Sequence, residues 1–151
     1  MLRQHHGQKD KAGKDYYLHP ARVSKNCLDT DAKIAALLHD TVEDTGLTFE
    51  DLLQAKFPQS VVDGVDAVTR RDGESYAEFI ERASCNKIGC EVKIRDLQDN
   101  MDITRLSNLT EKDLRRLNKY LHSWRYLKGL EVDTALITER SKFSLSPLNF
   151  Y

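Results

Sequence analysis

Apolar positions along the chain recur at intervals of three and four residues, and no stretch alternates convincingly between apolar and polar side chains. This spacing places apolar side chains on one face of a helix, whereas a half-buried strand requires alternation. In residues 59–69, Val61, Val62, Val65 and Val68 all fall on one side of a predicted helix. A second stripe, predicted to pack in the core, follows Thr110 and consists of Leu114, Leu117, Leu121, Trp124 and Leu127. The pattern therefore predicts an all-α domain of about six to eight helices.

Helix-starting residues divide the first part of the chain. Pro20 suits the first residue of a helix that runs to about Leu28. Thr30 is a candidate cap for a helix over residues 31–44, whose apolar side chains at 34, 35, 37 and 38 indicate deep burial. Gly46 is expected to end that helix.

Helix-starting residues also divide the chain from Thr48 onward. Thr48 is followed three residues later by Asp51, the spacing of a capping box. Ser75 is a candidate cap for another helix, and Gly89 is expected to precede a helix over about residues 90–102. We expect one domain over residues 1–143 and an irregular tail over 144–151.

Composition excludes several classes of function. The net charge of this 151-residue chain is −1, so no general attraction to nucleic acid or to anionic membranes is expected. No apolar run is long enough for a transmembrane helix, and the first residues lack the apolar stretch of a signal peptide. Three cysteines, an odd number without a C-x-x-C pair, favour a reducing compartment, and we expect a cytoplasmic protein.

Candidate chemistry is concentrated within residues 37–45. His39, Asp40, Glu43 and Asp44 lie within six residues of a predicted apolar helix. On a continuous helix, residues four apart share a face. The pair His39 and Glu43 and the pair Asp40 and Asp44 would therefore project from neighbouring stripes of the helix. Burying three carboxylates together is costly unless a cation neutralises them. Imidazole and carboxylate groups suit Mn, Fe, Zn or Co, and a metal site is the hypothesis that follows.

Two other segments offer further ligands. His19 precedes Pro20 at the start of a predicted helix, and Asp96 lies in a segment whose apolar residues indicate burial. Asn100 is one helical turn beyond Asp96 and shares its face. Two imidazoles and two carboxylates would give two nitrogen and two oxygen ligands.

Each residue also has a simpler interpretation. A His-Asp pair is common by chance, Glu43 and Asp44 could form a solvated helix end, and His19 could be a satisfied residue at a helix start. What favours a site is the order of the segments: His-Pro, then residues 37–44, then residues 92–101.

That ordered set resembles the HD superfamily of metal-dependent phosphohydrolases. Within it, the chain is most similar to the hydrolase domain of RelA/SpoT-type alarmone enzymes and to their small stand-alone relatives. The segments on which the resemblance depends are residues 6–13, 17–20, 36–45 and 93–101. It implies a single-domain helical bundle of the HD type.

The resemblance also implies roles for individual residues. It makes one divalent metal ion the cofactor, with manganese the family's usual ion and iron, zinc, cobalt or magnesium left open. Glu43 and Asp44 match the acidic pair that orients and deprotonates the attacking water, while Asn100 matches a residue of the nucleotide pocket. Lys9 and Lys11 match a loop that contacts substrate. The implied metal ligands are His19, His39, Asp40 and Asp96.

The implied activity is removal of the 3′-pyrophosphate from (p)ppGpp, a small phosphorylated nucleotide. Departures from the family pattern leave the substrate open: the loop around Lys9 lacks the family's first arginine, and Asp99 replaces the family's usual histidine. The alternatives are a phosphatase of nucleoside monophosphates or other phosphate esters, and a sensor that binds metal and nucleotide without turnover. A homo-oligomer also stays open.

Overall fold

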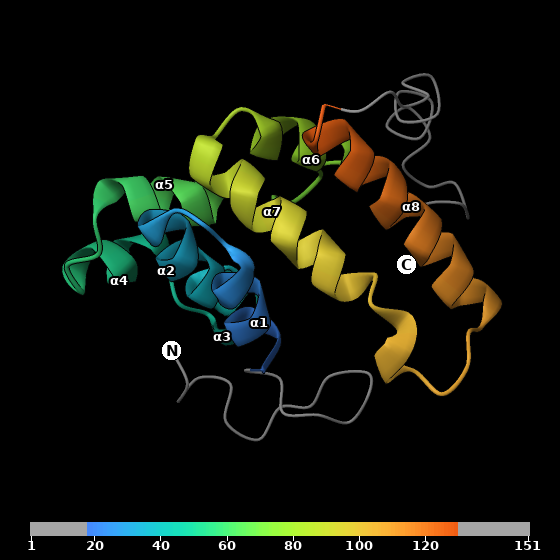
Figure 1. Cartoon of the computed structure of the whole chain (residues 1–151). Coiled ribbons are helices and arrows are strands. Elements are labelled where there is room, and N and C mark those ends of the chain that lie inside the picture. Colours follow the sequence, from blue (N-terminus) through green and yellow to red (C-terminus); the bar gives the residue numbers. More distant parts are fainter. Residues whose placement is uncertain (1–17, 130–151) are drawn as a thin grey trace.

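The computed structural model describes residues 18–129, and within this range every regular element is a helix (Figure 1). The predicted all-α fold is therefore confirmed. Lys9 and Lys11 and the predicted tail at 144–151 lie outside the described residues. The elements are α1 (Leu18–Asn26), α2 (Thr30–Leu38), α3 (Thr41–Thr45), α4 (Phe49–Gln54), α5 (Gln59–Ala67), α6 (Tyr76–Ser84), α7 (Lys87–Asn100), the 3-10 helix η1 (Ile103–Arg105) and α8 (Glu111–Leu127).

Helix α7 is the central element because its side chains enter two hydrophobic cores. Val92 of α7 belongs to the core that α7 shares with α1, α2, α4 and α5. Leu97 of the same helix belongs to a second core with Ile80 of α6 and Leu127 of α8. Figure 1 shows α7 running between α1 and α2 on one side and α6 and α8 on the other. A polar residue of α7 that faces α1 is thereby held between packed helices.

Three predicted helix starts are confirmed. Thr48, Ser75 and Thr110 each accept a hydrogen bond from the backbone N–H three residues on, and each forms a capping box. These side chains satisfy backbone donors that the first turn of a helix leaves unpaired. The cap of α2, however, is Asp29 and not Thr30, since the Asp29 carboxylate accepts from the N–H groups of residues 31 and 32.

The predicted continuous helix over residues 31–44 is wrong. Helix α2 ends at Leu38 and α3 begins at Thr41, so that His39 and Asp40 form the junction. Gly46 ends α3 with a positive φ of 74°, a conformation that glycine adopts without a steric penalty. The predicted pairing of faces four residues apart therefore does not apply, because His39 and Asp40 belong to different helix ends.

Gly89 does not precede a helix, contrary to the prediction, but lies inside α7. A Cβ atom at Gly89 would come within 2.6 Å of the Ala67 Cβ at the end of α5. One at Gly64 of α5 would come within 2.5 Å of the Ile88 Cγ2 of α7. Both contacts are too short for real atoms, so the two glycines allow α5 and α7 to approach closely.

The predicted core stripe on α8 is only partly correct. Leu127 is buried, but Leu114 and Leu121 are 50% and 47% exposed. The buried line on α8 is instead Lys119, Ser123 and Leu127, because α8 packs on one side only, against α6 and α7. None of the helices between residues 18 and 129 combines the length and the hydrophobicity that crossing a bilayer requires.

Candidate metal centre

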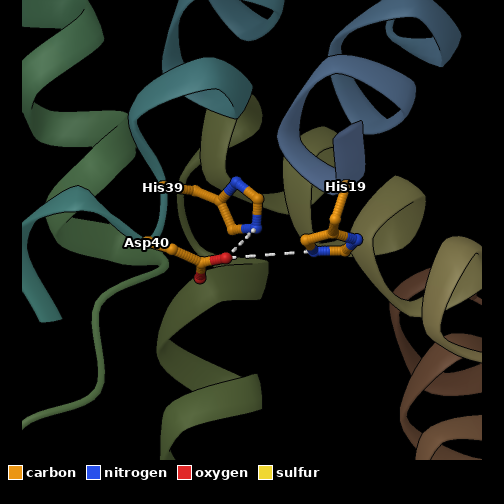
Figure 2. Close-up of side chains that lie close together, drawn as sticks. All are labelled: His19, His39 and Asp40. Atoms are coloured by element: carbon orange, nitrogen blue, oxygen red, sulfur yellow. Dashed lines mark ion pairs between the residues drawn. The ribbon is translucent and has the colours of Figure 1, made fainter. Parts of the chain in front are cut away.

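Three polar side chains from two separate parts of the chain converge beside α7. His19 comes from the first turn of α1, and His39 and Asp40 come from the α2–α3 junction. One potential ligand atom from each of the three lies within 4.8 Å of the other two. Figure 2 shows both imidazole rings turned toward the Asp40 carboxylate. Its Oδ2 is 3.3 Å from His39 Nε2 and 3.9 Å from His19 Nε2.

Asp96 of α7 brings a second carboxylate to the same place. Its Oδ1 lies 3.0 Å from His19 Nε2 and 3.4 Å from His39 Nε2. Its Oδ2 accepts a hydrogen bond of 2.7 Å from Lys93 Nζ, one turn earlier on α7. The structure thus brings together all four residues for which the sequence predicts metal ligation.

The donor set fits a cation. His39 Nδ1 lies 2.5 Å from the Ala36 carbonyl oxygen, to which it can only donate, and this leaves Nε2 as a lone-pair donor. Among the residues that the structure describes, His39 Nε2 is buried and has no hydrogen-bond partner. A buried nitrogen of this kind, aimed at two carboxylates, suits a divalent ion that accepts imidazole and carboxylate together.

Protons balance the charge of the carboxylates when no ion is bound. Burial alone would lower the pKa of His19, but hydrogen bonds with Asp96 and Asp99 raise it to about 10. Burial would raise the pKa of Asp96, yet the Lys93 charge and the two histidines hold it well below its ordinary value. A cation that entered the site would therefore displace protons from the imidazoles.

Of the other predicted site residues, the structure describes Glu43, Asp44 and Asn100. Glu43 Oε1 accepts a hydrogen bond of 2.6 Å from the backbone N–H of Arg70, which holds that carboxylate near the α3 end of the site. Asp44 follows on α3 and is exposed. Asn100 donates through Nδ2 to Asp96 Oδ1 at 3.0 Å, so it contacts a predicted ligand directly.

Comparison with known proteins places this geometry in a family. The family described as "HD domain" matches residues 1–89, more than half of the chain, which include His19, His39 and Asp40. The chain belongs to the HD domain family.

Relatives of this HD domain carry informative names. The guanosine-3′,5′-bis(diphosphate) 3′-pyrophosphohydrolase of Aquifex aeolicus is 32% identical in an alignment of 114 residues that covers 67% of this chain and 16% of that protein. The enzyme of the same name from Vibrio cholerae is 42% identical over 86 residues, 54% of this chain and 12% of that protein. The chain thus spans less than a fifth of the length of these relatives.

A solved structure resembles the HD domain over nearly its whole length. It is described as "A metazoan ortholog of SpoT hydrolyzes ppGpp and plays a role in starvation responses". The likeness has a TM-score of 0.68 at 25% identity and covers 97% of this chain and 91% of that one. The helical HD fold is therefore shown by structure as well as by sequence.

Two charged residues of this HD domain's centre were not predicted from the sequence. Lys93 pairs with Asp96, as described above, and Asp99 Oδ2 lies 2.6 Å from His19 Nδ1. The available signal was helical spacing, because Lys93, Asp96 and Asp99 follow one another at intervals of three and share a face of α7.

A group of cations surrounds Tyr76 on the α6–α8 side of the HD domain. Lys119 Nζ lies 4.2 Å from the centre of the Tyr76 ring, and the Arg70 guanidinium carbon and Lys93 Nζ lie at 5.9 and 6.0 Å. Lys93 links this group to the candidate metal centre through Asp96. Burial and the charges of Arg70, Lys93 and Arg116 lower the pKa of Lys119 to about 7.

The low pKa of Lys119 predicts how stability depends on pH. Because the ordinary lysine pKa is 10.5, the folded protein binds fewer protons than the unfolded chain between about pH 7 and 10.5. This group therefore makes the free energy of unfolding rise with pH in that window. Lys119→Met should remove that rise and stabilise the protein at pH 6 by about 1–3 kcal/mol, or several degrees in Tm.

Thermal unfolding at pH 6 and pH 9 measures the effect. The control is Lys112→Met in the first turn of α8, where the side chain is exposed. Equal Tm values for Lys119→Met and the wild type at pH 6 would contradict a destabilising buried charge.

Proposed function

We propose that this HD domain is a metal-dependent phosphohydrolase that removes the 3′-pyrophosphate of (p)ppGpp. The observation that supports it most directly is the meeting of His19, His39, Asp40 and Asp96 around the buried His39 Nε2, for which the described residues provide no hydrogen bond. The names of the relatives supply the substrate, and the match over nearly the whole chain to the structure of a SpoT ortholog that hydrolyzes ppGpp supports it.

In this proposal the two imidazoles and two carboxylates hold one divalent ion, with manganese as the first candidate. Such an ion, when bound, would lower the pKa of a water molecule and polarise a phosphoryl oxygen. Lys93 keeps Asp96 ionised and in place through its 2.7 Å hydrogen bond. The His39 ring is fixed in turn by the Ala36 carbonyl.

Glu43 is the proposed general base, with Asp44 as the second member of the acidic pair. Although Glu43 is an exposed residue, partial burial of its carboxyl group and the charge of Asp40 raise its pKa, while the Arg70 backbone N–H and the Lys93 charge oppose the shift. A carboxylate with a raised pKa accepts a proton from water more readily. The Arg70 N–H also fixes the orientation of the carboxylate.

The cations around Tyr76 are proposed to supply positive charge that attracts substrate phosphates to this side of the centre, with Lys119 acting from a buried position. Lys93 contacts Asp96, a predicted metal ligand, and shares the Tyr76 ring with Lys119 and Arg70. Positive charge therefore extends from Asp96 toward Tyr76. A nucleotide with phosphates at both ends of its ribose needs positive charge beyond that of one ion. Asn100, Lys9 and Lys11 remain the further substrate contacts that we propose.

A nucleotide panel tests the function. Purified protein with Mn²⁺ is incubated with (p)ppGpp, nucleoside monophosphates and simple phosphate esters, and the products are separated. We expect pyrophosphate to be released from (p)ppGpp. Release of inorganic phosphate from monophosphates would instead favour a general phosphatase, and tight nucleotide binding without products would favour a sensor.

The proposed site of action is the cytoplasm. Cys27, Cys85 and Cys90 are all free thiols in the structure. Free thiols are typical of reducing compartments, where nucleotide substrates also occur.

A further inference from the structure

We propose that Asp99 is a positioning residue for the metal centre: its carboxylate fixes the His19 ring so that Nε2, and not Nδ1, faces the other predicted ligands. This inference rests on the proposed function, because it gives Asp99 a task only if the centre binds an ion. In the sequence, Asp99 stands out only as a departure from the family pattern.

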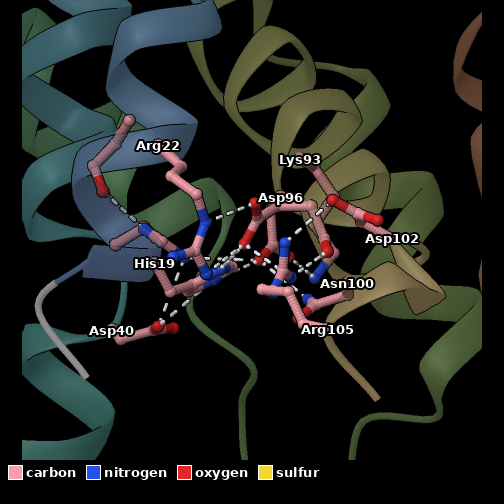
Figure 3. A network of polar contacts seen from close by, with 11 residues as sticks. His19, Arg22, Asp40, Lys93, Asp96, Asn100, Asp102 and Arg105 are labelled. Atoms are coloured by element: carbon pink, nitrogen blue, oxygen red, sulfur yellow. Dashed lines mark hydrogen bonds and ion pairs between the residues drawn. The ribbon is translucent and has the colours of Figure 1, made fainter. Parts of the chain in front are cut away.

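Two pairs of residues with equal spacing meet across the α1–α7 contact. His19 and Arg22 are three residues apart on α1, and Asp96 and Asp99 are three residues apart on α7. His19 Nδ1 lies 2.6 Å from Asp99 Oδ2, and His19 Nε2 lies 3.0 Å from Asp96 Oδ1. Each ring nitrogen is therefore engaged by a different carboxylate. Figure 3 shows His19 and Arg22 on α1 facing Asp96 and Lys93 on α7.

Asp99 is itself held in place from two sides. Arg22 donates from Nε to Oδ1 at 2.8 Å and from Nη2 to Oδ2 at 3.0 Å, a bidentate pair. Arg105 donates from Nη2 to the Asp99 backbone carbonyl at 2.6 Å and lies 3.4 Å from Oδ2. The Asp99 side chain is only 8% exposed. An ionised carboxylate clamped in this way presents a fixed acceptor to His19.

A fixed acceptor at Nδ1 decides the tautomer of the ring. Asp99 can accept but not donate, so Nδ1 carries the proton and the lone pair of a neutral ring lies on Nε2. That nitrogen is the one near Asp40 Oδ2 and Asp96 Oδ1. Carboxylates that accept from a metal-binding histidine typically contribute about 10–100-fold to metal affinity.

The position of Asp99 argues against its being a ligand itself. Its carboxylate contacts the Nδ1 edge of His19, whereas Asp40 and Asp96 approach Nε2. The His19 ring therefore lies between Asp99 and the other members of the cluster, His39 and Asp40. Loss of Asp99 should weaken metal binding and leave the reacting groups in place.

Titration of the metal-free protein with Mn²⁺ alone tests this role. Asp99→Ala should lower Mn²⁺ affinity by about 10–100-fold. Asp99→Asn, which keeps the shape, covers the case in which the alanine variant does not fold, and it should also bind more weakly. The matched control is Asp63→Asn on α5, an exposed carboxylate whose hydrogen-bond partner is Gln59 on the same helix.

Nitrogen NMR of the Zn²⁺-loaded protein gives a second readout that a merely structural role would not change. In the wild type, the His19 signals should show Nδ1 protonated and Nε2 bound to metal, and in Asp99→Ala they should show a mixture. Unchanged Mn²⁺ affinity and an unchanged His19 tautomer in both Asp99 variants would overturn the positioning role alone. A wild-type protein that binds none of Mn²⁺, Fe²⁺, Zn²⁺, Co²⁺ and Mg²⁺ would overturn the metal centre, and the proposed function with it.

Discussion

His39→Ala should abolish metal binding and nucleotide hydrolysis together, with kcat/KM at least about 10³-fold below the wild type. His39 is 3% exposed, and its Nε2 lies within 3.4 Å of carboxylate oxygens of both Asp40 and Asp96. Without the His39 imidazole, Asp40 and Asp96 would have only the His19 imidazole beside them to hold a cation. Metal content after dialysis and the rate of pyrophosphate release are the two measurements.

A matched control separates this effect from general damage. His122 lies on α8, outside the group of predicted ligands, and His122→Ala should keep both metal and activity. Circular dichroism of the His39→Ala variant would show whether it keeps its helical content. If it hydrolysed (p)ppGpp at the wild-type rate, the assigned mechanism would be wrong.

Glu43→Gln should separate catalysis from metal binding. Glutamine keeps an oxygen that can accept the 2.6 Å hydrogen bond from the Arg70 N–H, but it cannot take a proton from water. We expect kcat to fall by about 10²–10⁴-fold while the metal content is unchanged. The control is Glu81→Gln on α6, where the side chain is exposed.

The pH dependence of kcat gives a second test of Glu43 as the general base. Because the pKa of Glu43 is raised, this carboxylate becomes protonated at a higher pH than an ordinary glutamate. A protonated base cannot act, so log kcat of the wild type should fall as the pH is lowered through that pKa. This acid limb should be absent from Glu43→Gln. An identical limb in the variant would assign the titration to another group.

The fold was largely predictable because its signals are local. Thr48, Ser75 and Thr110 start helices through side chains that act within their own first turn. The α8 stripe was less predictable, because the exposure of Leu114 and Leu121 depends on which neighbours cover α8. Periodicity shows that a helix has an apolar face and does not show how much of it is covered.

The centre was predictable only in its parts. Sequence spacing and the family resemblance pointed to His19, His39, Asp40 and Asp96, but the single-helix geometry expected around His39 was wrong. Asp99 was missed because its role depends on α1 lying against α7, a contact between residues 80 positions apart. Pairing of this kind depends on tertiary structure, which no local pattern contains.

The two glycines between α5 and α7 have a consequence for the chemistry as well as for packing. Asp96 lies seven residues beyond Gly89, about 10 Å along the same rigid helix. Helix α5 and helix α2, which ends just before His39, both pack against α7, so the closeness of the α5–α7 crossing contributes to where Asp96 lies relative to His39. A methyl group added at either glycine would push α5 and α7 apart and increase the distance between the predicted ligands. The activity of an enzyme with this fold could therefore be lowered by a substitution at the crossing, without any change to a residue that contacts the ion.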